Sequence, residues 1–207
     1  MNGQFKNLML NIVKNPRLAF NSVIDEKLSK TKFLLLSLLG ISALFSNAIS
    51  KNLGDNFDST KLVLYLLVTG PIFGILWAYL ISALISWTGK WIKGYAKTNQ
   101  VLNVLSIAAI PLILILMVNA LFVAIFGSGI FKSGFDIQEY STLSILIYKI
   151  GNFVKTILLL YYLFLFVIGI STLQGFSIFK SILNILLALL TIVLPFVIIG
   201  FLMARLS

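Results

Sequence analysis

The sequence has no cysteine and no histidine, and its 207 residues include only six carboxylates. Disulfides, Cys or His metal sites, and catalysis through a thiol or an imidazole are therefore excluded. The acidic side chains that could act as general acids or bases are scarce as well. We therefore expect a protein without enzymatic activity, with no catalytic residue, no bound metal and no cofactor.

Charged residues are also few, since they make up 11% of the chain against about 25% in soluble domains. Hydrophobic residues make up 59%, and the mean hydropathy is +1.05. A soluble fold would have too little polar surface to cover so much apolar area. The composition therefore indicates an integral membrane protein in contact with the lipid bilayer.

The net charge is +10, which in a soluble domain would suggest a nucleic-acid partner. Here the basic residues flank apolar segments, as cations do when they face anionic lipid headgroups. Because no basic stripe is interleaved with stacking aromatic residues, we expect no binding to nucleic acid.

Five long stretches of the chain are apolar and nearly free of charge. A bilayer core of ~30 Å requires ~20 apolar residues in an α-helix, and an open strand would leave its backbone groups unpaired in lipid. The sequence therefore predicts an all-α, polytopic membrane protein with five transmembrane helices, at about 33–50, 63–86, 101–126, 153–173 and 182–204. The start of the fourth helix is left open, near Ile137 or near Asn152.

Residues 1–32 form an amphipathic leader before the transmembrane domain of residues 33–207. Apolar residues recur in the leader at helical spacing: Phe5, Leu8, Met9, Ile12 and Val13, then Phe20, Val23, Ile24 and Leu28. Asn15 and Pro16 are typical of an N-cap followed by proline at the first helical position. Such a helix can lie at the headgroup level or pack on the helix bundle. We do not expect a cleavable signal peptide, because the leader is long and patterned.

The distribution of lysine and arginine predicts the orientation. The leader carries six of these residues, and the loop after the second span carries three with no acid. When alternate sides are combined, ten lie on the side of the N-terminus and six on the other. We therefore expect a cytoplasmic N-terminus and a C-terminus outside. Frequent Lys, Asn, Ile and Phe suit the cytoplasmic membrane of a low-GC bacterium.

The loop after the second span carries our candidate partner-binding residues: Lys90, Trp91, Lys93 and Lys97. The alternative role for aromatic residues there is to anchor the helix at the membrane interface. That interpretation applies to Trp77, Trp87, Trp91 and Tyr95.

Three prolines, Pro71, Pro111 and Pro195, lie inside the apolar stretches. They indicate either a broken helix around a substrate site or kinks that shape packing. We favour packing, because no carboxylate lies within the spans.

Polar residues within the spans are expected to form hydrogen bonds between helices: Ser42, Ser82, Ser106, Asn119 and Asn184. Lys149, Asn152 and Lys155 share one helix face, and we place them at the outer start of the fourth helix. We expect the two lysines to extend to the interface; the alternative is a lip that attracts anions.

The order of these features resembles the Yip1 family. The family's proline and nearby phenylalanine before the first span are similar to Asn15–Phe20, and its Gly-rich basic loop is similar to Gly94-Tyr95-Ala96-Lys97. Ala108-Ala109-Ile110-Pro111 matches its small-residue–Pro signature, and Gln174–Ser181 looks like its last loop, although the family commonly has alanine where Ser181 stands.

The resemblance implies five spans, a cytoplasmic N-terminus and no enzymatic activity. Eukaryotic relatives act in vesicle traffic and contact small GTPases of the Rab type. The long acidic cytoplasmic region that suits this role is missing here, and bacteria lack Rab proteins. A Rab-type GTPase is therefore not an expected partner.

Our first hypothesis for the function is a non-enzymatic scaffold or accessory subunit of an envelope transport or membrane-trafficking system. Its partner, another membrane protein, would bind the leader and the loop from Lys90 to Lys97. The alternative is a small transporter or channel built around the Pro71 and Pro111 kinks, with a polar cavity between the second and third helices. An enzyme acting on lipids is disfavoured, since Asp25 and Glu26 are more typical of a solvated helix end.

Overall fold

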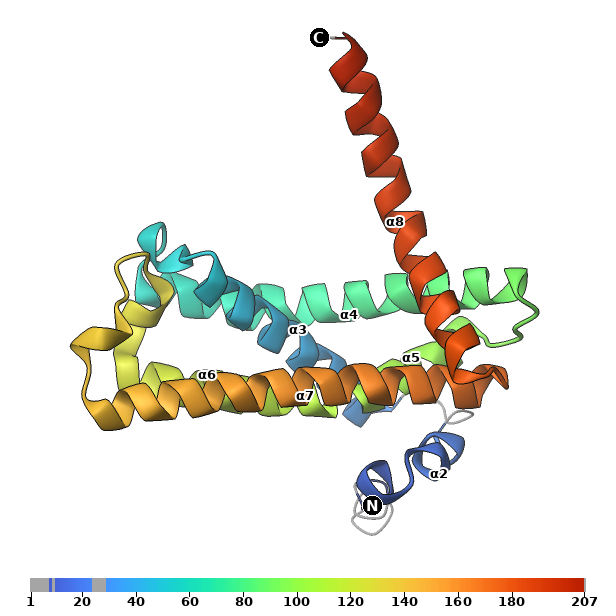
Figure 1. The fold of residues 1–207 in the computed structure, drawn as a ribbon, viewed down its shortest axis with the longest axis horizontal. Helices are drawn as coiled ribbons and strands as arrows, with labels where there is room; N and C mark the ends of the chain where they lie inside the picture. The colour runs from blue at the N-terminus through green and yellow to red at the C-terminus, as the bar shows by residue number, and fades with distance from the viewer. Residues whose placement is uncertain (1–7, 9, 24–28, 207) are drawn as a thin grey trace. The chain divides into compact units, whose positions relative to one another are not determined.

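The computed structural model describes residues 8, 10–23 and 29–206. Its helices are α2 (Pro16–Asn21), α3 (Lys30–Ser50), α4 (Ser59–Trp91), α5 (Thr98–Ala108), α6 (Ile110–Phe126), α7 (Thr142–Gln174) and α8 (Ile178–Leu206) (Figure 1). Short 3₁₀ turns lie at η1 (Leu53–Asp55), η2 (Gly127–Phe131) and η3 (Ile137–Glu139). Over these described ranges the chain contains no strand, and five of its helical segments are long and apolar enough to cross a membrane. The predicted all-α membrane fold is therefore confirmed.

The fourth membrane helix, α7, begins at Thr142, between the two starts that the sequence left open. The third predicted span contains two helices, because α5 ends at Ala108 and α6 begins at Ile110. Pro111 has no N–H to donate to the preceding turn, so the helix is interrupted there. The Ala109 carbonyl instead accepts from Leu112 N at 2.9 Å and from Ile113 N at 3.2 Å.

The chain forms two compact units. One contains the described parts of residues 1–28 with 78–105 and 165–207, and the other contains residues 29–77 and 106–164. We describe each unit by itself.

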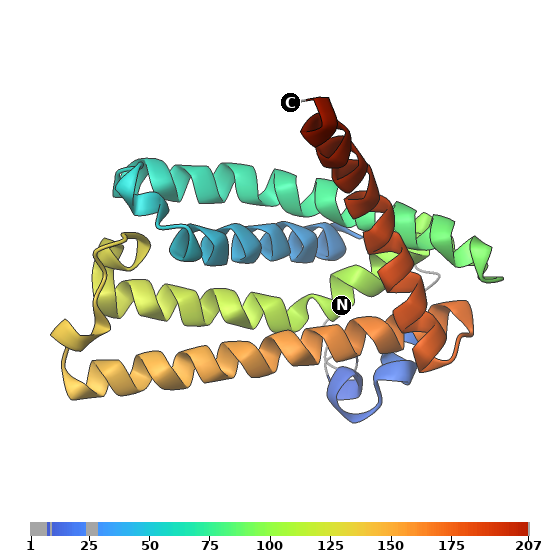
Figure 2. The same ribbon diagram turned by 45° about the horizontal axis from the view of Figure 1, so that its top comes forward.

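In the second unit, α3 lies beside the first half of α4 (Figure 2), and the two helices cross closely at three glycines. Gly70 and Gly74 are one turn apart on α4, and they face Gly40 of α3 so closely that a Cβ on any of the three would overlap the other helix. Close approach through small residues is a common way for membrane helices to pack. Pro71 lies inside this crossing, and α4 continues through it without a break.

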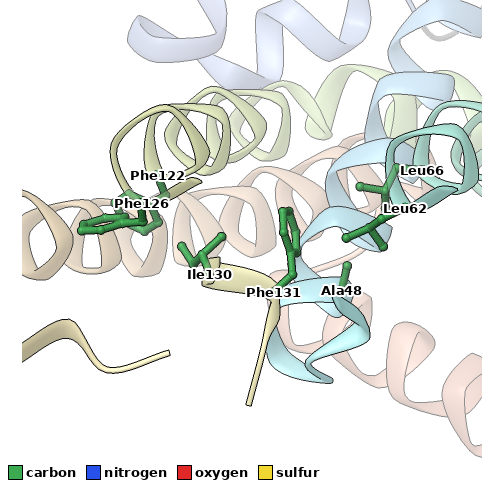
Figure 3. Close-up of a cluster of buried hydrophobic side chains, with 7 residues drawn as sticks. All are labelled: Ala48, Leu62, Leu66, Phe122, Phe126, Ile130 and Phe131. Atoms are coloured by element: carbon green, nitrogen blue, oxygen red, sulfur yellow. The ribbon is translucent and has the colours of Figure 1, made fainter. Parts of the chain in front are cut away.

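A cluster of buried apolar side chains lies in the same unit, where the end of α3, the start of α4, the end of α6 and η2 meet (Figure 3). Its members are Ala48, Leu62, Leu66, Phe122, Phe126, Ile130 and Phe131. In the same region, the Asp55 carboxylate accepts from Ser133 N at 3.1 Å. Asp58, just before α4, accepts from Lys61 N at 2.9 Å. That backbone hydrogen bond, together with the Lys61 ammonium, lowers the pKa of Asp58 below its ordinary value.

In the first unit, α2 begins as predicted. The Asn15 side chain accepts from Leu18 N at 3.4 Å, and Pro16 is the first helical residue. Phe20 is fully buried, and its ring lies beside Gly169 of α7. This face of the leader therefore packs on the helices, while Leu18 remains 56% exposed. The predicted leader positions Phe5, Met9, Ile24 and Leu28 lie outside the described residues, as do Asp25 and Glu26.

Among the side chains of α8 that the structure describes, the buried ones lie in the first half of the helix. Ser181, Asn184 and Ala188 are buried at helical spacing, whereas the described side chains from Leu189 onward are exposed or half-buried. Exposed apolar side chains such as Val193, Leu194 and Val197 are compatible with lipid as the solvent. Pro195 lies in the second half of α8, and the helix continues through it.

The predicted hydrogen bonds between helices are confirmed for three of the five residues. Ser42 donates to the Leu112 carbonyl at 2.6 Å, Asn119 donates to Ser46 Oγ at 3.0 Å, and Thr88 donates to Asn184 Oδ1 at 2.8 Å. Ser82 is buried with no hydrogen-bond partner in the described part of the chain, so the prediction is wrong there; Ser106 is buried in α5.

Candidate functional site

The candidate loop begins where α4 ends, at Trp91. Gly94 N donates to the Gly89 carbonyl at 2.8 Å, and Lys93 N donates to the Lys90 carbonyl at 3.2 Å. These two bonds form a Schellman motif, whose αL position is usually a glycine. Here Lys93 occupies it, with φ of 65°. The loop therefore holds a lysine in a backbone conformation that costs energy.

One side chain fixes the rest of this loop. Gln174, the last residue of α7, accepts through Oε1 from Tyr95 N at 3.0 Å and from Ala96 N at 3.1 Å. The Ala96 carbonyl accepts from Ser86 Oγ at 2.7 Å, so both backbone groups of this buried residue are paired. A Cβ on Gly94 would overlap Gln174 Oε1 and lie 2.8 Å from the Phe176 ring. The loop is thus closely fitted to the end of α7.

The predicted site residues all point outward from this fixed backbone: Lys90, Trp91, Lys93 and Lys97 are exposed. Trp91 is 53% exposed and packs edge-on against Trp87, with ring centroids 4.8 Å apart. The loop therefore presents three ammonium groups and an indole pair on a constrained scaffold. That these residues bind a partner remains a prediction.

Replacing Lys93 by glycine is expected to raise the free energy of unfolding by about 0.5–1 kcal/mol, because glycine adopts αL without the Cβ clash. The measurement is the thermal unfolding midpoint in detergent, followed by circular dichroism. Lys90→Gly is the matched control, since it removes the same charge from the helical end of α4 and should destabilise. An equal loss of stability in both variants would show that the Lys93 backbone is not strained.

A second polar site lies in the other unit, at Lys155. It is 13 residues beyond the start of α7 at Thr142, so the prediction that it stands at the outer start of this helix is wrong. Residues 142–152 are mostly apolar, and they extend α7 ahead of Lys155. Lys149 is exposed, as expected, but Lys155 is half-buried, with its Nζ 5.3 Å from the centre of the Phe122 ring.

Sequence reasoning missed two features for which the sequence held a signal. Gly70 and Gly74 form a small-xxx-small pattern on α4, which indicates a close helix crossing. Ser42 and Ser46 are one turn apart on α3, and this spacing places both hydroxyls on one face. The role of Gln174 had no comparable signal, because nothing in the sequence relates it to a loop 78 residues earlier.

Five long apolar helices with polar groups buried between them define a polytopic α-helical membrane protein. The family model described as the Yip1 domain matches residues 10–200, nearly the whole chain. The chain therefore belongs to the Yip1 family, and the resemblance drawn from the sequence is confirmed. No curated protein and no solved structure matches it.

Proposed function

We propose that this Yip1-family membrane protein is a non-enzymatic scaffold or accessory subunit of an envelope transport or membrane-trafficking system. Its partner is another membrane protein, bound through Lys90, Trp91, Lys93 and Lys97. The protein resides in the cytoplasmic membrane of a bacterium, with the N-terminus and this loop in the cytoplasm and the C-terminus outside.

The observation that carries this proposal is the fixed backbone beneath the exposed lysines. Gln174 and Ser86 hold the loop from α7 and α4, and Lys93 is kept in a strained conformation. A residue stays in a strained backbone conformation only where contacts around it hold it there. Such residues are frequent at binding sites. A loop whose shape is set before binding also loses less entropy when a partner docks.

The alternative, a small transporter or channel, has less support at Pro71. This proline lies within the tight crossing of Gly40, Gly70 and Gly74, where there is no room for a solute. Pro111 separates α5 from α6, but the described pocket near it is formed by α3, α6 and α7 and does not include α4.

The test is crosslinking and affinity purification from native membranes with a tag on the leader, followed by mass spectrometry. We expect one stoichiometric membrane partner, reduced at least tenfold when Lys90, Lys93 and Lys97 are all changed to glutamate. The physical reason is that the substitution reverses the charge that an acidic partner surface would meet.

The matched control changes three exposed lysines outside the loop, Lys51, Lys132 and Lys149, to glutamate; it should retain the partner. Because the chain has no cysteine, an added Ser177→Cys labelled from one side checks that both variants keep their orientation. Purification of the wild-type protein alone, or an undiminished partner in the loop variant, would refute the proposal.

A further inference from the structure

A pocket of about 460 Å³ lies in the second unit, between α3, α6 and α7. Apolar side chains form most of its wall: Leu39, Ala43, Leu112, Ile115 and Leu159. Its polar lining comes from Ser42 and Ser46 on α3 and from Asn152, Lys155 and Thr156 on α7. The exposed residues Ala43, Thr156 and Leu159 are among the lining, so the pocket opens on the surface of the helices.

Most of the polar groups in this pocket are already paired with protein atoms. Ser42 donates to the Leu112 carbonyl at 2.6 Å, and Thr156 donates to the Asn152 carbonyl at 3.0 Å. Asn152 donates one amide hydrogen to the Tyr148 carbonyl at 3.1 Å. These groups contribute polarity, but their strongest donors are occupied.

Besides the second amide hydrogen of Asn152, two donors in the described lining remain available for a ligand. Ser46 Oγ accepts from Asn119 Nδ2 at 3.0 Å, so its own hydroxyl hydrogen is left to donate. The Lys155 ammonium makes no hydrogen bond and no ion pair with the residues that the structure describes, and its contact is with the face of the Phe122 ring at 5.3 Å. The pocket therefore contains the Lys155 cation, which no carboxylate of the described residues neutralises.

The position of Lys155 within the long apolar helix α7 makes this cation costly. It lies six residues beyond the exposed Lys149, or about 9 Å further along the helix at ~1.5 Å per residue. A charged side chain within the hydrocarbon region is unfavourable without a counter-ion or water. An anion that enters the pocket would remove that penalty and bind for this reason.

We propose that this pocket binds an anionic membrane amphiphile, with its oxyanion on Lys155 Nζ and Ser46 Oγ and its chain along the apolar wall. The charge specifies the headgroup, since an ammonium and a hydroxyl donor complement a carboxylate or a phosphodiester. The wall specifies the rest, because Leu39, Ile115 and Leu159 provide no partner for a polar solute. A fatty acid and an anionic phospholipid share this chemistry.

The test uses the full chain purified in a neutral detergent and titrated separately with oleate, phosphatidylglycerol and phosphatidylcholine. Binding is followed by native mass spectrometry and by the thermal unfolding midpoint. We expect oleate or phosphatidylglycerol to bind and raise the midpoint, with phosphatidylcholine at least tenfold weaker. Which of the two anions binds more tightly identifies the source of the oxyanion.

Lys155→Met keeps the length of the side chain and removes its charge, so it should weaken anion binding at least tenfold. Without lipid it should be no less stable than the wild type, which separates lost binding from lost folding. Lys149→Met is the matched control and should bind as the wild type does. Equal binding by Lys155→Met, or equal binding of phosphatidylcholine, would overturn the proposal; a co-purified protein held through Lys155 would assign the pocket to a partner carboxylate instead.

Discussion

Replacing Gly40 by alanine is expected to lower the free energy of unfolding by about 3 kcal/mol, at the upper end of the range for overpacking in a filled core. A Cβ on Gly40 would overlap the Gly70 carbonyl oxygen and lie 2.5 Å from Gly74 N and 2.6 Å from Gly74 Cα. All three are backbone atoms, which cannot move aside as the end of a flexible side chain can. The helices α3 and α4 would have to separate, with loss of contact along the crossing.

The measurement is the thermal unfolding midpoint in detergent, together with the yield of monodisperse protein. Gly74→Ala should behave like Gly40→Ala, because its Cβ would lie 2.7 Å from Gly40 Cα. Gly134→Ala is the control: a Cβ there meets no atom within 4 Å, so stability should change little. A midpoint for Gly40→Ala within a degree or two of the control would rule out the close crossing.

The second large effect is expected from Gln174→Leu, which should cost about 2–4 kcal/mol because two backbone donors lose their acceptor. The Ala96 N–H contributes most, since Ala96 is 1% exposed and water cannot replace the lost bond. Thermal unfolding measures the loss of stability. The labelling rate of an added Tyr95→Cys measures the release of the loop, and it should rise in the Gln174→Leu background.

Thr172→Val is the control for this substitution. It removes a hydroxyl two residues earlier on the same helix, where it donates only to the Ile168 carbonyl of its own helix at 2.8 Å. Neither stability nor the labelling rate should change much. An unchanged labelling rate in Gln174→Leu would mean that other contacts hold the loop.

The sequence predicted the membrane helices because their signal is local. Twenty apolar residues in a row leave few alternatives in lipid, and Asn15 with Pro16 determines a helix start within four residues. The break at Ala109 was not predicted: one continuous span was expected over 101–126 with Pro111 as a kink, whereas α5 ends at Ala108 and α6 begins at Ile110. The separation of α5 from α6 also depends on tertiary packing, because residues 101–108 of α5 are all buried.

The candidate site was predicted only in part, for a related reason. The lysines of the loop are apparent from their spacing, but the bonds from Gln174 and Ser86 to Ala96 depend on tertiary packing. Lys155 was misplaced because the fourth span was predicted at 153–173, from the charge-free stretch that follows Lys155, whereas α7 already begins at Thr142. Local sequence patterns therefore predicted which side chains are charged, but not their burial or their contacts.

The glycine crossing also fixes how far α3 can slide along α4. Lipid gives little penalty for a one-turn shift of apolar helices, because either alignment exposes similar surface to the hydrocarbon. One turn before Gly40 stands Leu36, and one turn after it stands Leu44; neither would fit between Gly70 and Gly74. The same shift would carry Ser42 and Ser46 away from Leu112 and Asn119. The absence of a side chain at Gly40 thus selects one alignment of α3 along α4, where hydrophobicity alone would allow several.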